Sequence, residues 1–221
     1  MLGKQVDPDE ITLEEGAELV RLARSAVEKY LSEGKEVSPP ADRDKFRRPG
    51  ASFVTIMSVS NGREELRGCI GYTRAFEPLH VNVVHAAIAA ATQDPRFPPL
   101  SLSELDRVVF EVSILSKPEL LEGVGRELFG QIVIGRDGLI VESGYYTGLL
   151  LPEVPVEYCW DKETFLSETC LKAYLPPDCW MERDVHVYRF RTKAFKEEKP
   201  KGKVFERDLH KEYVERCSKK A

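Results

Sequence analysis

The sequence lacks the patterns that identify several common classes of protein. Its five cysteines include no Cys-x-x-Cys pair, although zinc sites and iron–sulfur clusters usually show such close spacing. No stretch approaches the ~20 apolar residues that a helix needs to cross a membrane. The glycines form neither a G-x-G-x-x-G nor a Walker A pattern. The sequence therefore requires no metal or cofactor, and neither a membrane protein nor a nucleotide-binding fold is expected.

An excess of positive charge is also missing. The chain has 32 Lys and Arg against 37 Asp and Glu, a formal net charge of −5. This balance argues against nucleic-acid binding, and RNA binding through residues 43–48 and the Lys-rich tail is a weaker alternative. Residues 1–11 carry three carboxylates and no apolar run, so a secretory signal is not expected. The odd number of cysteines, with no close spacing between them, predicts a reduced, cytoplasmic protein.

What the sequence does contain is enough apolar material for a core, 42% over 221 residues. Capping residues, apolar periodicity and proline stops predict helices, whereas apolar runs beside turn signals predict strands. The predicted helices are 12–34, 78–93, 161–173 and 205–217, and the predicted strands are 51–60, the segment around 67–69, 107–115, 131–134, 139–142 and 185–190.

These elements favour an α+β fold, with a mostly antiparallel sheet flanked by helices, because hairpins and helices mix without regular alternation. Asn-Gly at 61–62 predicts a tight hairpin, and Arg-Asp-Gly at 136–138 predicts a second. Residues 144–155 are predicted to be irregular, since glycines and prolines punctuate them. Residues 196–221 are predicted to form a charged tail with some helix.

The octapeptide at 65–72, Glu-Leu-Arg-Gly-Cys-Ile-Gly-Tyr, is the main candidate for a site. Alternation along a strand predicts that Arg67 and Cys69 share one face with Glu65, opposite Leu66, Ile70 and Tyr72. A guanidinium beside a thiol favours the thiolate, which is the nucleophilic form. The alternative is that Cys69 is a small buried hydrophobe.

Residues around this octapeptide complete the candidate site. Gly68 and Gly71 allow another backbone or a ligand to come close. His85 is the candidate partner of the thiol, since a nucleophile needs a base; otherwise it is a histidine bonded to backbone.

Two further pairs of charged residues have alternative interpretations. Asp94 and Arg96 form either a cleft wall that binds an anionic ligand or a mutual loop brace. Glu157 and Asp161 provide either an acid–base pair or, in the case of Asp161, a helix cap. Cys159, Cys170 and Cys179 are interpreted as structural, and the aromatic residues 145, 146 and 160 line either the core or a pocket.

The hexapeptide Leu-Arg-Gly-Cys-Ile-Gly at 66–71 resembles the signature of the AMMECR family. The stretches 94–100, 148–157 and 160–173 resemble the same family, so the resemblance spans residues 12–195. Two positions depart from the family pattern. Glu153 replaces a glutamine, and Tyr174 replaces a glycine, so the preceding helix is expected to lack its left-handed cap.

The resemblance implies a single domain over residues 1–221, with a main lobe, a smaller lobe and the charged tail. It also implies association with Memo-type and radical SAM proteins, beside which relatives are encoded or to which they are fused. Two hypotheses follow. One is an enzyme-like protein in which Cys69 reacts while Arg67 and Arg96 bind an anionic substrate. The other is a non-catalytic binding or scaffold module for a partner in that pathway.

Overall fold

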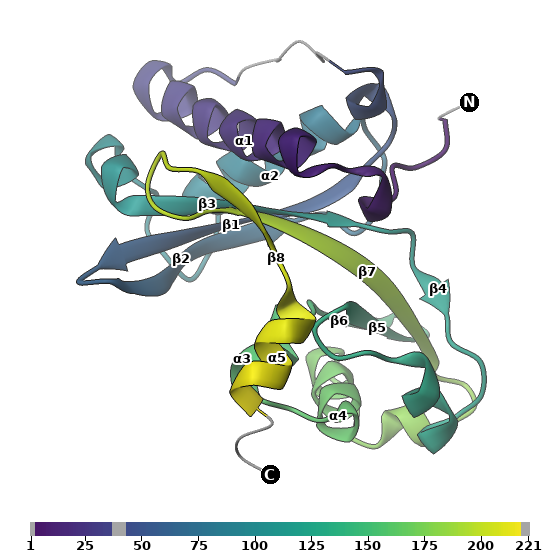
Figure 1. Cartoon of the computed structure of the whole chain (residues 1–221). Helices are drawn as coiled ribbons and strands as arrows, with labels where there is room; N and C mark the ends of the chain where they lie inside the picture. The colour runs from purple at the N-terminus through teal and green to yellow at the C-terminus, as the bar shows by residue number, and fades with distance from the viewer. Residues whose placement is uncertain (1–2, 37–42, 218–221) are drawn as a thin grey trace. The chain divides into compact units, whose positions relative to one another are not determined.

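The computed structural model describes residues 3–36 and 43–217, and the chain divides into two compact units (Figure 1). Unit 1 comprises residues 1–116 and 193–207, and unit 2 comprises residues 117–192 and 208–221. The strand pairs described below are all antiparallel, and helices flank them. The predicted α+β fold is therefore confirmed.

Unit 1 is built from two long helices and a sheet. Its helical elements are η1 (Pro8–Glu10), α1 (Leu13–Glu33), η2 (Asp44–Arg47), α2 (Leu79–Thr92) and η3 (Leu102–Arg107). Its strands are β1 (Ala51–Ser60), β2 (Arg63–Gly71), β3 (Val108–Leu115), β8 (Val204–Arg207) and the end of β7 (His186–Glu197). The order is β2-β1-β3-β7, with β8 also paired to β7, so β2 lies at an edge.

Local sequence explains the limits of α1. The Thr12 side chain accepts the Glu15 N–H while the Glu15 carboxylate accepts the Thr12 N–H, which is the predicted capping box. Gly34 ends the helix in the left-handed conformation, with φ of 67°. Apolar residues of α1 and α2 then pack with Val54 and Ile56 of β1, and Figure 1 shows both helices on one side of the β1–β2–β3 sheet. The opposite face of the β1–β2–β3 sheet is not packed by α1 or α2.

The predicted hairpin between β1 and β2 is confirmed. Asn61 and Gly62 have φ of 51° and 73°, the conformation that a tight two-residue turn requires. The register shifts by one residue along the ladder, because Met57 pairs with Leu66 while Ile56 pairs with Gly68. Arg67 is the extra residue of a β-bulge, opposite no single partner.

The bulge overturns the predicted division of faces in β2. Directly paired residues of an antiparallel ladder project to the same side of the sheet. Cys69 pairs with Thr55 and Leu66 pairs with Met57, so these two β2 residues share a face. Glu65 pairs with Ser58 and therefore lies on the opposite face, together with Ile70, the partner of Val54. The prediction that Glu65 shares the Cys69 face, and Leu66 the Ile70 face, is wrong.

Unit 2 is a smaller sheet with short helices. Its elements are β4 (Glu119–Leu120), η4 (Gly125–Gln131), β5 (Asp137–Ser143), β6 (Tyr146–Leu150), α3 (Glu153–Tyr158), α4 (Lys162–Lys172), η5 (Cys179–Met181), the beginning of β7 and α5 (Leu209–Cys217). β5 lies between β7 and β6, and β4 pairs with β7.

Two predictions for unit 2 are wrong. Residues 131–134 do not form a strand, because the buried Asp137 carboxylate accepts the Val133 N–H at 2.7 Å and fixes a turn. Residues 144–155 are not irregular, since Gly144 starts a tight turn with φ of 57° and β6 and α3 follow. Gly148 belongs to β6, where a Cβ atom would lie 2.3 Å from the Ala173 nitrogen. That glycine permits close packing rather than a loop.

The predicted charged tail is largely ordered structure. β7 continues to Glu197 and pairs with β8, and only 209–217 is helical; residues 218–221 lie outside the described part. The Glu197 carboxylate is buried between the Arg24 guanidinium and the Phe110 N–H. Glu197, at the start of the predicted tail, is therefore part of a buried ion pair in the core of unit 1.

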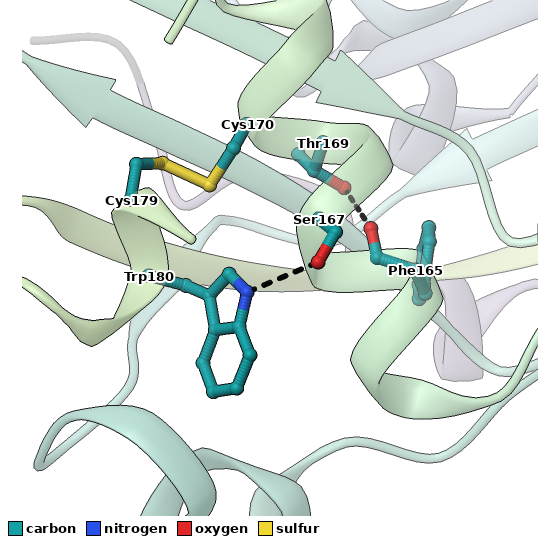
Figure 2. Close-up of a disulfide and its surroundings, with 6 residues drawn as sticks. All are labelled: Phe165, Ser167, Thr169, Cys170, Cys179 and Trp180. Atoms are coloured by element: carbon teal, nitrogen blue, oxygen red, sulfur yellow. Dashed lines mark hydrogen bonds between the residues drawn. A yellow bond between two sulfur atoms is a disulfide. The ribbon is translucent and has the colours of Figure 1, made fainter. Parts of the chain in front are cut away.

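Four cysteines form disulfides, so the prediction of a fully reduced chain is wrong. Cys159 is bonded to Cys217, and Cys170 is bonded to Cys179. Figure 2 shows the second bond joining α4 to η5, where the adjacent Trp180 donates to Ser167 at 3.2 Å. No close spacing signals either pair, because the partners lie 58 and 9 residues apart.

The expected loss of the left-handed cap after α4 does not occur. Tyr174 takes the left-handed conformation itself, with φ of 59°. Its N–H donates to the Leu171 carbonyl and the Leu175 N–H donates to the Cys170 carbonyl, which is the Schellman arrangement. A tyrosine thus occupies a position that glycine fills without strain.

Candidate functional site

Cys69 lies on edge strand β2 and is the one cysteine that keeps its thiol. It is half-buried, and its Sγ accepts a hydrogen bond from the Thr55 hydroxyl at 3.3 Å. Thr55 pairs with Cys69 on one side and with Glu111 of β3 on the other. The three side chains therefore form a cross-strand row on the sheet face opposite the one packed by α1 and α2.

The backbone of Cys69 faces away from β1. Tyr72 donates its N–H to Ser52, and hydrogen-bonded pairs alternate along an antiparallel ladder, so the Cys69 groups point to the open edge. Asp94 accepts the Cys69 N–H at 2.9 Å, and Arg96 Nη2 approaches the Cys69 carbonyl at 3.4 Å. The loop after α2 thus supplies the partners that a further strand would otherwise provide.

Asp94 and Arg96 form a tight ion pair at this edge. Nε and Nη2 of Arg96 donate to the two oxygens of Asp94 at 2.9 and 2.7 Å. These bonds, opposed by burial and assisted by the Cys69 N–H, lower the pKa of Asp94 to about 2. The pKa of Arg96 is raised, first by Asp94 and to a smaller extent by Coulombic attraction from Cys69. The loop-brace interpretation is correct, and the Arg96 guanidinium also lies within electrostatic reach of the sulfur.

Arg67 has a structural role in the same region. Its guanidinium donates to Glu104 of η3 at 2.9 Å and to the carbonyls of Pro98 and Pro99 at 2.9 and 3.4 Å. The Arg67 side chain is 13% exposed, against 53% for Arg96. Of the two predicted anion-binding arginines, Arg96 is therefore the accessible one.

The two glycines of the hexapeptide are used for close packing. A Cβ atom on Gly68 would lie 2.1 Å from the Ala90 carbonyl oxygen of α2. On Gly71 it would lie 2.3 Å from the Phe53 ring. The prediction of close approach is confirmed, and the approaching groups belong to the chain itself.

The structure does not bring His85 to the thiol. Its Nδ1 contacts the Glu77 carboxylate at 2.9 Å and its Nε2 contacts Glu36 at 2.8 Å. Both ring nitrogens are therefore engaged by carboxylates, so His85 is not the partner of Cys69.

The carboxylate pair Glu157 and Asp161 lies in unit 2. Glu157 is exposed on α3. Asp161 caps α4 by accepting the Thr164 N–H at 2.8 Å, which lowers its pKa. The cap interpretation of Asp161 is correct. The aromatic residues of this region separate, since Tyr145 and Tyr146 are exposed whereas Trp160 packs at the edge of the unit 2 core.

Thr55, Glu111 and Arg207 were not candidates from the sequence. Glu111 is 3% exposed and accepts hydrogen bonds from Arg207 of β8 at 3.0 and 3.3 Å. A threonine and a glutamate inside apolar strands carry no distinctive signal, because only the register reveals that they align with Cys69.

Three features of the described part of the chain concern metal ions, membranes and nucleic acids. Over residues 3–36 and 43–217, no cluster of three His, Cys, Asp or Glu is arranged to hold a metal ion. The same residues contain no helix that is both long and apolar enough to span a bilayer. In the proposed RNA-binding segment, Arg43 pairs with Glu18 and Arg48 with Glu10, which reduces the charge available to phosphate.

Comparison with known proteins identifies the family. A model of the AMMECR1 family matches residues 20–195, which include the whole Cys69 region. The chain belongs to the AMMECR1 family. Protein PYRAB00100 of Pyrococcus abyssi is 51% identical over 197 residues, covering 88% of this chain and 96% of that protein. A protein of Thermofilum pendens is 51% identical over 207 residues, covering 90% and 97%.

A solved structure of an AMMECR1-family protein agrees with this fold. The crystal structure of the uncharacterized protein PH0010 from Pyrococcus horikoshii matches with a TM-score of 0.85 and 50% identity. The match covers 90% of this chain and all of that one. The family assignment therefore covers most of the chain, and the α+β fold agrees with a solved structure.

Proposed function

We propose that this AMMECR1-family protein is enzyme-like, with Cys69 as its reactive thiol and Arg96 as the anchor for an anionic group of the substrate. One observation carries the proposal: the Asp94–Arg96 pair engages both the N–H and the carbonyl of Cys69. The loop that carries Arg96 is thereby attached to the strand that carries Cys69, and such rigid support is what a precise site requires.

The ligand that suits this arrangement has a carboxylate or phosphate next to an electrophilic carbon. Within the described residues, no hydrogen bond uses Nη1 of Arg96, so that part of the guanidinium can receive an anion. A neighbouring cation also favours the thiolate over the thiol. Arg67 is assigned to positioning, because Glu104 and two carbonyls already occupy it.

Two alkylating reagents of different charge test the proposal. Each forms an S–C bond at Cys69 and releases iodide, and the thiol proton passes to solvent. We expect folded protein to react with iodoacetate and with iodoacetamide, and Arg96→Gln to lower the iodoacetate-to-iodoacetamide rate ratio several-fold. Peptide mass spectrometry measures both rates, and Arg183→Gln, at an exposed position of unit 2, is the matched control. An unchanged ratio in Arg96→Gln would remove Arg96 from the site.

A binding module is the second candidate, favoured by the surface beside Cys69. The guanidiniums of Arg67 and Arg96 lie 5.9 and 5.6 Å from the ring centre of Phe97, and the Phe97 loop has three exposed prolines. Rigid aromatic and arginine surfaces are typical of protein interfaces. Memo-type and radical SAM proteins are the partners to test, and a cytoplasmic location belongs to the same proposal.

Binding of a purified Memo-type or radical SAM protein, measured by titration calorimetry, tests this second candidate. Phe97→Ala should weaken binding at least tenfold, since truncating a central aromatic anchor commonly costs about 2 kcal/mol or more of binding free energy. Phe76→Ala is the control, because Phe76 is 72% exposed in the loop that follows β2. Equal weakening by both variants would argue against the Phe97 surface.

A further inference from the structure

Thr55 contacts the candidate thiol directly. Its hydroxyl donates to Cys69 Sγ at 3.3 Å across the β1–β2 ladder. We propose that Thr55 is a positioning residue that stabilises the Cys69 thiolate and fixes the direction in which the sulfur points. This inference rests on the proposed reactivity of Cys69 and adds a residue that no motif identifies.

The pairing of β1 with β2 holds the Thr55 hydroxyl close to the Cys69 sulfur. Thr55 and Cys69 form a non-hydrogen-bonded pair of the ladder, in which opposing side chains come closest, with Cα atoms about 4.5 Å apart. Threonine is also β-branched, so its χ1 angle has few alternatives. The strand pairing and the restricted χ1 angle together therefore fix the position of the hydroxyl relative to the sulfur.

The charges around the sulfur are arranged to tolerate a thiolate. Two carboxylates belong to this region: Asp94, which accepts the Cys69 N–H, and Glu111, which lies opposite Thr55 on β3. Arg96 neutralises Asp94 and Arg207 neutralises Glu111, both through pairs of hydrogen bonds. A carboxylate repels a nearby thiolate, and a paired guanidinium offsets that repulsion.

The Glu111–Arg207 pair also leaves the Thr55 hydroxyl available to the sulfur. An ionised carboxylate is only an acceptor and would compete for the hydroxyl hydrogen. Arg207 satisfies both oxygens of Glu111, and Thr55 donates to Cys69. Ionisation then consists of loss of the thiol proton to solvent, with the hydroxyl hydrogen bond strengthened by the charge that forms.

The test compares Thr55→Val, which keeps the side-chain shape, with Thr55→Ser, which keeps the hydroxyl. Iodoacetamide alkylation of Cys69 is followed against pH by peptide mass spectrometry on folded protein. We expect Thr55→Val to shift the midpoint upward and to lower the rate near pH 7 about tenfold, whereas Thr55→Ser stays close to wild type. Thr147→Val, at an exposed position of β6, is the matched control.

The outcomes separate this inference from the proposed function. If wild-type Cys69 reacts in the folded protein and Thr55→Val has the same pH profile, the inference is overturned while the reactive thiol stands. If wild-type Cys69 reacts only after unfolding, both are overturned. Circular dichroism verifies folding of each variant, and Thr55→Ala replaces Thr55→Val if the valine variant does not fold.

Discussion

At the scale of single residues, Asp94 links two parts of the chain that are 25 residues apart. Its carboxylate accepts the Cys69 N–H and three bonds from Arg96. The sequence allowed two interpretations of Asp94, a brace or a cleft wall. The sequence could not decide between them. The backbone N–H and carbonyl of Cys69 need partners from a loop only because β2 lies at the edge of the sheet.

The pKa of Asp94 gives the first prediction at this scale. It falls from 3.8 to about 2 in the folded protein, chiefly through the Arg96 hydrogen bond. The unfolded chain binds its proton more tightly, so this contribution is fully present above pH 3.8 and is lost as the pH falls through 2. We expect Asp94→Asn to lower the free energy of unfolding by about 2 kcal/mol at pH 7.

Urea unfolding followed by circular dichroism measures this difference at several pH values. The gap between wild type and Asp94→Asn should narrow as the pH falls from 4 to 2. Asp184→Asn, at an exposed position of unit 2, should show no such gap. A gap that is constant over this pH range would mean that ionisation of Asp94 is not its source.

The site shows which residues a sequence can reveal. Arg67, Cys69 and the glycines stand out because their types are unusual in a strand, and all of them make close or specific contacts. Thr55 and Glu111 do not stand out, since they join Cys69 only through the pairing of three strands. His85 was proposed from its nearness in sequence, and carboxylates hold it elsewhere.

At the scale of elements, helices with strong end signals were predicted to within a residue or two. α1 and α4 begin at side-chain caps, Thr12 and Asp161, which act locally and are visible in the sequence. The segment 131–134 was wrong because the buried Asp137 converts an apolar run into a turn. The limits of β7 were wrong because tertiary pairing with β8 and burial of Glu197 extend it.

Tyr174 gives a prediction about a helix end. It is 89% exposed, so its ring contributes little packing, while its left-handed backbone costs roughly 1 kcal/mol for a residue with a Cβ atom. Tyr174→Gly should therefore raise the free energy of unfolding by about 1 kcal/mol. Tyr174→Ala, which keeps the Cβ atom, should give no such gain.

Tryptophan fluorescence during urea unfolding is the appropriate measurement. Both tryptophans of the chain, Trp160 and Trp180, lie in unit 2 and report on the unit that contains α4. Equal stability of the glycine and alanine variants would show that the left-handed conformation is not the source of the cost.

At the scale of the whole molecule, the sequence predicted the α+β class but not the covalent framework. Both disulfides lie in unit 2, and they connect α3 to α5 and α4 to η5. Disulfides persist in oxidising compartments, and inside cells they are uncommon outside hyperthermophilic organisms. The two bonds therefore indicate one of these two environments. Which cysteines pair depends on the return of α5 to unit 2, which no local pattern reveals.

The path of the chain through the two units has a consequence for synthesis. Residues 117–192, most of unit 2, are inserted between two segments of unit 1. At roughly 5–20 residues per second, the ribosome needs several seconds to make that insertion. During this interval β3 has emerged without β7, its neighbour in the sheet, and Glu111 without Arg207. The nascent chain therefore exposes an incomplete sheet edge, and the surroundings of Cys69 are completed only when nearly the whole protein has been made.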